Sequence, residues 1–174
     1  DFRTFTFRVK PGIFFADDPA FKGSKRELVA QDYVYSLKRH YDPRWNSPNL
    51  YRLEAVKILG LSELRQQVLK TKQPFPYDRE VEGLRALDRY TFQVKLAEPA
   101  PRFHQEVLTD AANFGALARE VVEFYGDKIM GHPVGTGPFK FVEYVPGQRL
   151  VLESHDAYHQ GLPGVKQVLE AIEG

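Results

Sequence analysis

The sequence predicts an α+β protein, in which helices and strands are interspersed without a regular βαβ rhythm. Three observations support this class: an alternation of apolar and polar residues at the amino terminus, an amphipathic stretch over residues 30–41, and two alternating runs over residues 139–152. The expected architecture is a mixed sheet with short flanking helices.

The first element is a strand, because Phe5, Phe7 and Val9 alternate with polar residues in the manner of a half-buried strand. Pro11-Gly12 ends it, and residues 13–15 are expected to form a short apolar strand. Residues 17–28 then predict an ordered surface loop anchored by Phe21, and the basic residues within that loop are interpreted as solvated.

Residues 30–41 carry the clearest helical pattern of the chain. Asp32 in the first turn and basic residues in the last turn both suit the helix dipole. Asp42-Pro43 ends the helix, since a residue before proline disfavours the helical region. The apolar stripe consists of Tyr33, Val34, Leu37 and Tyr41.

The middle of the chain gives weaker patterns. Residues 44–53 are rich in Asn, Pro and Ser and predict a loop that carries Trp45, Asn49 and Tyr51. Residues 55–61 fit either a strand or a short helix. The remaining expected elements are a helix over 62–69 capped by Ser62, a strand over 81–87, a turn at 88–89, a strand over 90–96, and short helices over 103–108 and 118–125, the last ended by Gly126.

Residues 134–141 combine two glycines, a threonine and a proline before an alternating run. The pattern predicts a tight backbone element that leads into a hairpin, with Pro146-Gly147 at its turn and residues 165–172 as a final strand. Gly135 and Gly137 are expected to allow unusual backbone angles or a close approach to another segment. A dinucleotide-binding loop is a poor fit, because it needs a third glycine and a following helix.

Composition excludes several classes of site. The chain has no cysteine, so disulfides and cysteine-ligated metals are excluded. The 24 basic and 23 acidic residues nearly balance, which argues against nucleic acid as a partner. His155 and His159 are four residues apart but lack a metalloprotease motif, so we expect two surface histidines and no metal site. No serine lies in a Gly-x-Ser-x-Gly elbow, and no cofactor motif is present.

Several segments match one family in the same order along the chain. The segment Ala30-Gln31-Asp32-Tyr33-Val34-Tyr35-Ser36 resembles a helix of the form A-x-D-V-x-x-S, and Pro133-Val134-Gly135-Thr136-Gly137-Pro138-Phe139 resembles P-V-G-T-G-P-Y/F. Residues 4–15, 86–92 and 150–161 are similar to a strand, a turn with a strand, and a closing strand of the same family. The chain therefore resembles the family 5 (peptide/nickel type) extracellular solute-binding proteins of ABC importers.

This sequence also departs from the family pattern. Asp17-Asp18-Pro19 and an insertion to Glu27 replace the usual Asp-Gly after the first strands. Val29 stands where the family has threonine, and a valine side chain cannot cap a helix. Ser154-His155-Asp156 replaces the usual Asn-Pro near the end. These differences affect local loop shape and helix stability rather than family membership.

The resemblance implies a substrate-binding component that captures a peptide or a similar small solute and delivers it to a membrane permease. It implies a type II periplasmic-binding-protein fold, of which residues 1–133 would be mainly the small subdomain of the amino-terminal lobe and residues 134–174 the strands returning to the main sheet. The start of the chain inside a strand predicts an excised fragment. A signal sequence is absent from it, and the expected location is periplasmic or membrane-anchored outside the cytoplasm.

The resemblance also implies that this chain holds at most half of a binding site. Asn46-Ser47-Pro48-Asn49-Leu50-Tyr51 contains an S-P-x-x-Y segment that can approach the ligand in family members. The expected ligand-binding residues are Tyr51, Asn49, Trp45, Gly135, Thr136 and Gly137, and no catalytic residue is expected. Two alternatives stay open from the residues alone: a hydrolase domain with an unrecognised carboxylate or serine site, and a purely structural or interaction subdomain.

Overall fold

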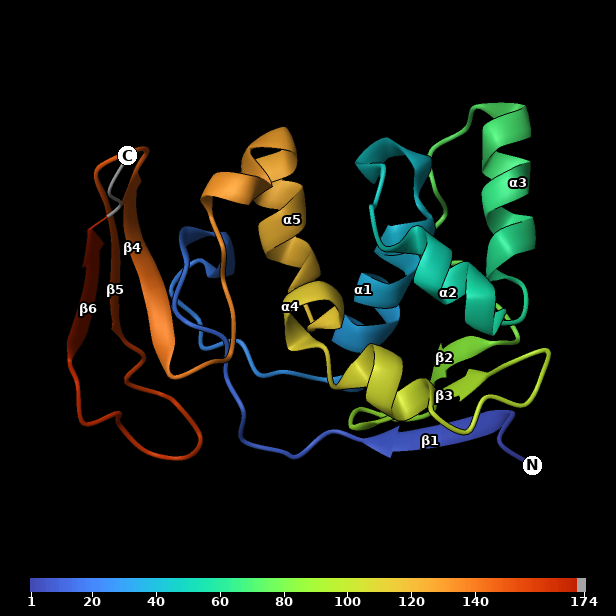
Figure 1. The fold of residues 1–174 in the computed structure, drawn as a ribbon, viewed down its shortest axis with the longest axis horizontal. Coiled ribbons are helices and arrows are strands. Elements are labelled where there is room, and N and C mark those ends of the chain that lie inside the picture. Colours follow the sequence, from blue (N-terminus) through green and yellow to red (C-terminus); the bar gives the residue numbers. More distant parts are fainter. Residues whose placement is uncertain (172–174) are drawn as a thin grey trace. The chain divides into compact units, whose positions relative to one another are not determined.

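The computed structural model describes residues 1–171, and the chain divides into two compact units. Unit 1 comprises residues 1–9 and 29–116, and unit 2 comprises residues 10–28 and the chain from Leu117 onward. Both contain helices and a three-stranded sheet, so the predicted α+β class is confirmed (Figure 1). All strand pairs of the described residues are antiparallel, within two separate sheets. None of the described helices is long and apolar enough to cross a membrane.

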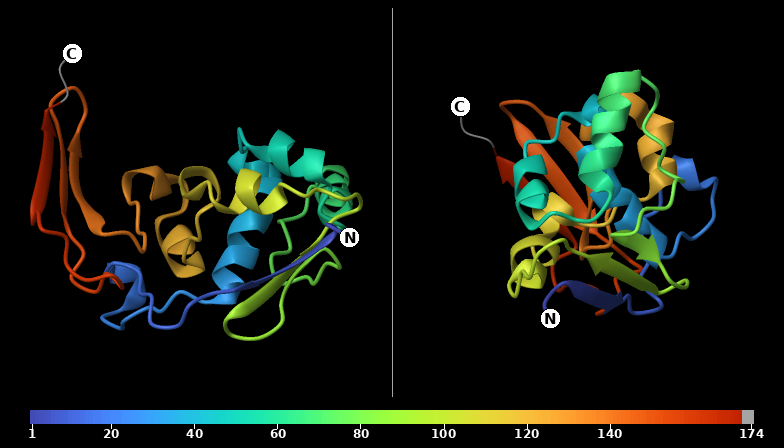
Figure 2. Two further views of the ribbon diagram at one scale, coloured as in Figure 1. Left: turned by 60° about the horizontal axis from the view of Figure 1, so that its bottom comes forward. Right: turned by 90° about the vertical axis from the view of Figure 1, so that its right-hand side faces the viewer.

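Unit 1 is built on a sheet of strand order β1-β3-β2, covered on one face by helices. Its elements are β1 (Thr4–Arg8), α1 (Ala30–Tyr41), the 3-10 turn η2 (Pro43–Trp45), α2 (Leu50–Val56), α3 (Leu61–Thr71), β2 (Leu84–Ala86), β3 (Thr91–Lys95), the π-helix η3 (His104–Leu108) and α4 (Ala111–Phe114). The register places Phe5 opposite Val94 and Phe7 opposite Phe92. These side chains share one face of the sheet, and Tyr33 of α1 stacks on Phe92 there. Figure 2 shows α1 lying along this sheet.

Helix α1 begins and ends at the residues that the sequence predicts. Val29 supplies no side-chain cap, but its amide donates to the Asp32 carboxylate at 2.8 Å. The Ala30 amide donates to the Arg89 carbonyl at 2.9 Å, which joins two of the family-like segments. The apolar stripe is buried at Val34, Leu37 and Tyr41, so burial of one face determines where this helix packs.

Unit 2 contains the loop of residues 17–28, a helix and the second sheet. Its elements are η1 (Pro19–Phe21), α5 (Arg119–Tyr125), η4 (Gly126–Gly131), β4 (Phe139–Val145), β5 (Arg149–Ser154) and β6 (Gln167–Ala171), with strand order β4-β5-β6. The predicted final strand over residues 165–172 is observed as β6, which begins two residues later, and Ile172 lies outside the described residues. The buried Phe21 anchors the loop as predicted.

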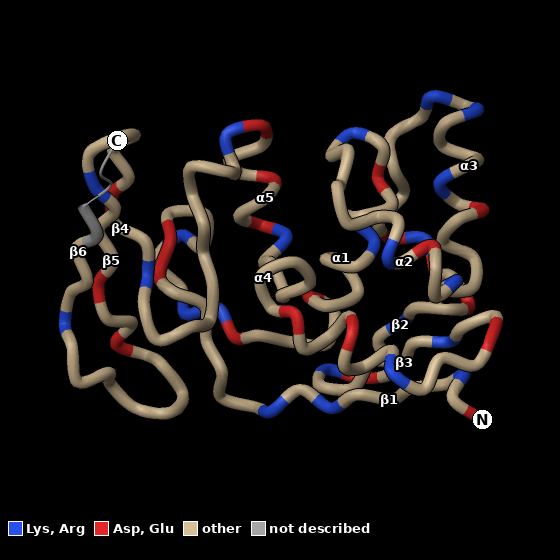
Figure 3. Tube along the Cα trace, in the orientation of Figure 1, with Lys and Arg blue, Asp and Glu red and all other residues tan. Residues whose placement is uncertain are grey.

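The loop of residues 17–28 is fixed to α5 by polar contacts within unit 2. The Tyr125 hydroxyl donates to Asp18 at 3.0 Å, and Arg26 forms an ion pair with Glu120 at 2.9 Å. Lys25 pairs with Asp17 at the surface. Two basic residues of this loop, Lys25 and Arg26, therefore form ion pairs rather than being only solvated. Basic and acidic residues are interspersed along the described chain without a large cluster of either sign (Figure 3).

Several expected elements differ in the structure. Residues 13–15 form no strand, because only one bridge joins Phe14 to Glu27. Residues 55–61 are neither one strand nor one helix: α2 ends in a left-handed Lys57, Ile58 forms a bridge, and α3 then begins. Ser62 is not a cap, because α3 begins at Leu61 after Gly60. Predicted strand 81–87 is shortened to β2, with a bridge at Val81.

Candidate functional site

The segment before α2 is fixed by short local contacts. Asp42 accepts from the Arg44 amide at 3.0 Å and so starts the 3-10 turn η2. Ser47 accepts from the Asn49 amide at 3.3 Å, and helix α2 begins one residue later. Tyr51 therefore lies in the first turn of a helix and not in a loop as predicted. The fully buried Leu53 supplies the packing that orders this short helix.

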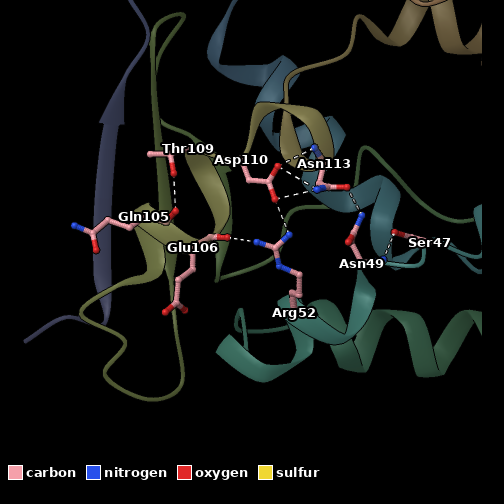
Figure 4. A network of polar contacts seen from close by, with 8 residues as sticks. All are labelled: Ser47, Asn49, Arg52, Gln105, Glu106, Thr109, Asp110 and Asn113. Carbon is pink, nitrogen blue, oxygen red and sulfur yellow. Dashed lines mark hydrogen bonds and ion pairs between the residues drawn. The ribbon is translucent and has the colours of Figure 1, made fainter.

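A polar network joins α2 to η3 and α4 (Figure 4). Asn49 donates its side-chain amide to Asn113 at 2.8 Å, and the Asn113 side chain donates to Asp110 at 2.9 Å. Arg52 donates to the same carboxylate oxygen, Asp110 Oδ2, at 2.7 Å and also donates to the Glu106 carbonyl. The Arg52 hydrogen bond is the main cause that lowers the pKa of Asp110, so this carboxylate stays ionised.

Arg52 is also held from below by an aromatic ring. Its guanidinium lies 4.7 Å from the centroid of Phe114, which is buried at the end of α4. The planar guanidinium can stack on a ring while it makes two in-plane hydrogen bonds. Arg52 therefore fixes the distance between α2 and the segment 106–114, and with it the position of the adjacent Tyr51.

Between α2 and η3 lies a groove of about 460 Å³. We name it the α2–η3 groove. The exposed ring of Tyr51 stands at it, with 69% of that residue accessible. Its lining residues are Tyr51, Arg52, Ala55, Val56, Gln105, Glu106, Val107 and Asp110.

Trp45 has a different environment from Tyr51 and Asn49. Its indole nitrogen donates to the Tyr77 hydroxyl at 3.1 Å, and Tyr77 donates to Asp42 at 2.7 Å. The guanidinium groups of Arg39 and Arg44 lie 4.0 and 4.6 Å from its ring centroid. The single polar hydrogen of the indole is thus already used within unit 1, beside a second groove of about 780 Å³ that Tyr77 lines.

His40 supports the same region from the inside. Its Nδ1 lies 2.6 Å from the Ser47 hydroxyl, and its ring packs 5.0 Å from Phe114. Burial, followed by the nearby charge of Arg39, lowers the pKa of His40 to about 4. The imidazole is therefore neutral at physiological pH and ties the Ser47 loop to α4 through uncharged contacts.

Acid is expected to destabilise unit 1 through His40. The unfolded chain binds this proton near pH 6.5 and the folded chain only near pH 4, so stability is lost as pH falls through this window. The full shift would correspond to about 3 kcal/mol, and partial solvent access reduces the expected loss to about 2 kcal/mol. Urea unfolding at pH 7, 5 and 4 should show a flatter dependence in His40→Asn. An unchanged slope in that variant, matching the exposed control His104→Asn, would contradict the assignment.

The glycine-rich segment belongs to unit 2, whereas the α2 residues belong to unit 1. The Gly135 carbonyl accepts from the Ala16 amide at 2.9 Å, and the Gly137 carbonyl accepts from His155 Nδ1 at 2.9 Å. Thr136 between them is half-buried. Neither glycine has a positive φ, and a Cβ at either would meet nothing within 4 Å among the described residues. The expected unusual backbone angles are therefore absent at Gly135 and Gly137, and the contact with Ala16 does not depend on a missing side chain.

His155 is also placed differently from the expectation. It is 4% exposed rather than on the surface, and its amide donates to the Pro138 carbonyl at 2.8 Å. The ring and the main chain of His155 therefore both bind the residues that immediately precede β4. Within residues 1–171, no three His, Asp or Glu residues are grouped as metal ligands would be.

Within unit 1, the structure brings together Asn49 and Tyr51 but not Trp45. Asn49 belongs to the polar network and Tyr51 to the adjoining groove, whereas Trp45 has other partners and the glycine segment is in unit 2. Sequence reasoning missed Arg52, Glu106, Asp110 and Asn113. Adjacency to Tyr51 was the one available signal for Arg52, and its partners lie 54 to 58 residues away.

Comparison with known proteins supplies the context for this site. The periplasmic oligopeptide-binding protein OppA of Salmonella typhimurium is 28% identical over 160 residues, which cover 91% of this chain and 26% of that protein. The dipeptide-binding protein of Escherichia coli is 27% identical over 183 residues, covering 99% of this chain and 30% of that protein. The chain thus spans between a quarter and a third of the length of these relatives.

Solved structures agree with the fold. The unliganded open form of the periplasmic murein tripeptide-binding protein MppA superposes with a TM-score of 0.72 at 25% identity, over 98% of this chain and 30% of that one. Haemophilus influenzae OppA in complex with the peptide RPPGFSPFR gives a TM-score of 0.69 at 25% identity, over 92% and 28%. The family described as bacterial extracellular solute-binding proteins, family 5 Middle, matches residues 1–170, and the chain belongs to this family.

Proposed function

We propose that the protein containing this chain is the solute-binding component of an ABC importer and that it binds a peptide or a similar small solute outside the cytoplasm. The observation that carries the proposal is the family match over residues 1–170. Relatives named as periplasmic oligopeptide- and dipeptide-binding proteins support a peptide as the solute and the periplasm as the location. The family is one of solute-binding proteins, which supports a role in capture rather than in catalysis.

The partner that follows from this proposal is a membrane permease, to which the loaded protein would deliver its solute. Within this chain, Tyr51 and the α2–η3 groove are the proposed contribution to solute binding. The support is geometric: an accessible ring stands beside a concave surface, and a network of Asn49, Arg52 and Asp110 fixes the helix that carries it. A fixed scaffold reduces the ordering cost of binding.

Peptide binding and the contribution of Tyr51 can be measured together. In isothermal titration calorimetry of the full-length protein, di-, tri- and longer peptides should include saturable ligands. Tyr51→Ala should then lower their affinity about tenfold, because the ring provides apolar area and a hydroxyl at low entropic cost. Tyr144→Ala is the matched control, since Tyr144 is also an exposed tyrosine but lies in unit 2.

Titrations of the wild type test the peptide-binding role, and titrations of Tyr51→Ala test whether Tyr51 belongs to the binding site. Absence of heat with every peptide class would contradict peptide capture. Peptide binding that is equally strong in Tyr51→Ala and wild type would keep the transport role and remove Tyr51 from the site. Equal losses in both tyrosine variants would point to a general effect on the protein.

A further inference from the structure

The α2–η3 groove has an unbalanced charge. Its charged lining residues are Arg52, Glu106 and Asp110, which sum to one negative charge. Arg52 and Asp110 are paired at 2.7 Å and largely cancel each other. Glu106 therefore supplies the net charge that a bound molecule would meet.

The carboxylate of Glu106 has no partner in the described part of the chain. It is exposed, and Figure 4 shows it with no interaction to a neighbouring side chain. Arg102 precedes it by four residues in the sequence, yet the two form no ion pair. The main chain of Glu106 is nevertheless fixed, because its carbonyl accepts from Arg52. The main chain of Glu106 is thus held in place, while its carboxylate has no hydrogen-bond or ion-pair partner among the described residues.

The rest of the groove suits the stem and the charge of a cationic side chain. Ala55, Val56 and Val107 give it an apolar lining, along which a methylene chain can lie. Tyr51 adds an accessible ring with no hydrogen bond among residues 1–171. A cation above such a ring is attracted by its π face.

The backbone of the segment that contains Glu106 is also unusual. Residues His104–Leu108 form a π-helix, in which the Thr109 amide donates to the His104 carbonyl at 3.2 Å. Such wide turns are rare and recur at functional sites. Here the wide turn places Glu106 and Val107 on the groove, together with the Gln105 of the same turn.

We propose that the α2–η3 groove is a subsite for a cationic nitrogen group on an apolar stem, recognised by the Glu106 carboxylate and the Tyr51 ring. This inference rests on the proposed peptide-binding function. The group is either the ammonium or guanidinium of a Lys or Arg side chain or the amino terminus of the peptide. Charge complementarity, rather than size, is what selects this occupant.

The test uses the full-length protein and four forms of one tripeptide that the wild type binds: with a central lysine or norleucine, each with a free or an acetylated amino terminus. Glu106→Gln should lower affinity about tenfold for forms that carry the recognised cation, in line with a charge-assisted hydrogen bond. It should leave affinity unchanged for the forms without that cation. Glu80→Gln, an exposed glutamate of unit 1 outside the groove, is the matched control.

The four peptides identify the source of the charge. A loss that follows lysine supports side-chain recognition, and one that follows the free amino terminus supports terminal recognition. Equal affinity of wild type and Glu106→Gln for all four peptides would overturn the subsite while the peptide-binding role stands. Failure of the wild type to bind any peptide would overturn both. A thermal melt of Glu106→Gln that matches wild type confirms that the variant is folded.

Discussion

Phe103→Ala is expected to lower the free energy of unfolding by about 4 kcal/mol. Phe103 is fully buried, and its ring centroid lies 5.1 Å from that of Phe5 and 6.5 Å from that of Phe7. Removing the ring takes away the apolar contact between β1 and the start of η3. It also leaves a cavity that the surrounding sheet can fill only in part.

The same change should weaken solute binding. Phe103 directly precedes η3, which contributes Glu106 and Val107 to the α2–η3 groove. A π-helix of five residues has little intrinsic stability and depends on tertiary packing for its position. Loss of Phe103 therefore affects both the stability of unit 1 and one wall of the groove.

Urea unfolding followed by circular dichroism measures the stability effect. Phe124→Ala provides the control, because Phe124 is 60% exposed and its removal should cost less than about 0.5 kcal/mol. Phe103→Leu should lie between the two and keeps the protein folded for peptide titration. A Phe103→Ala variant as stable as Phe124→Ala would show that η3 is not held through this ring.

The sequence predicts well those elements whose signals are local. Helix α1 has its apolar stripe, its acidic first turn and its Asp42-Pro43 stop within twelve residues, and its bounds are confirmed. Strands β1 and β3 follow from alternation alone, since one face of each meets the core. The sequence predicts the helix that begins at Ala30 and the turn at Arg89 separately. It does not predict the hydrogen bond that joins them, because that contact depends on the tertiary fold.

The candidate site shows where such reasoning stops. Helix α2 has only seven residues, and its order depends on Leu53 packing and on an ion pair from Arg52 to Asp110, 58 residues later. No local pattern encodes that contact, so the segment was predicted to be a loop. Tyr51 was selected by resemblance, whereas Glu106 and Asn113 required the fold.

The glycines also show that a sequence motif and a requirement of the fold can fall on different residues, and this difference can be tested. The sequence motif directs attention to Gly135 and Gly137, where a Cβ would meet open space. Gly83, which no motif indicates, is a position where the fold leaves no room for a side chain. A Cβ on Gly83 would lie 2.3 Å from the Leu59 carbonyl oxygen and 2.4 Å from the Leu59 nitrogen, both main-chain atoms.

Gly83→Ala is therefore expected to destabilise the protein by about 3 kcal/mol, the upper part of the usual range for overpacking. Main-chain atoms cannot yield as the end of a flexible side chain can. The Gly83 amide donates to the Leu59 carbonyl at 2.9 Å, and the Gly83 carbonyl accepts from Lys95 at 2.8 Å. A shift of Gly83 would disturb both hydrogen bonds, and with them the link between β3 and the turn that leads into α3.

Gly135→Ala is the matched control, because it makes the same chemical change where the described chain leaves open space and the backbone has no positive φ. Its urea midpoint should stay close to wild type, whereas that of Gly83→Ala should fall. Hydrogen exchange should locate the effect, with faster exchange of the Gly83 and Lys95 amides in Gly83→Ala. Equal stability of the two variants would mean that the main chain around Leu59 can move to admit a methyl group, and the tight contact at Gly83 would not be a requirement of this fold.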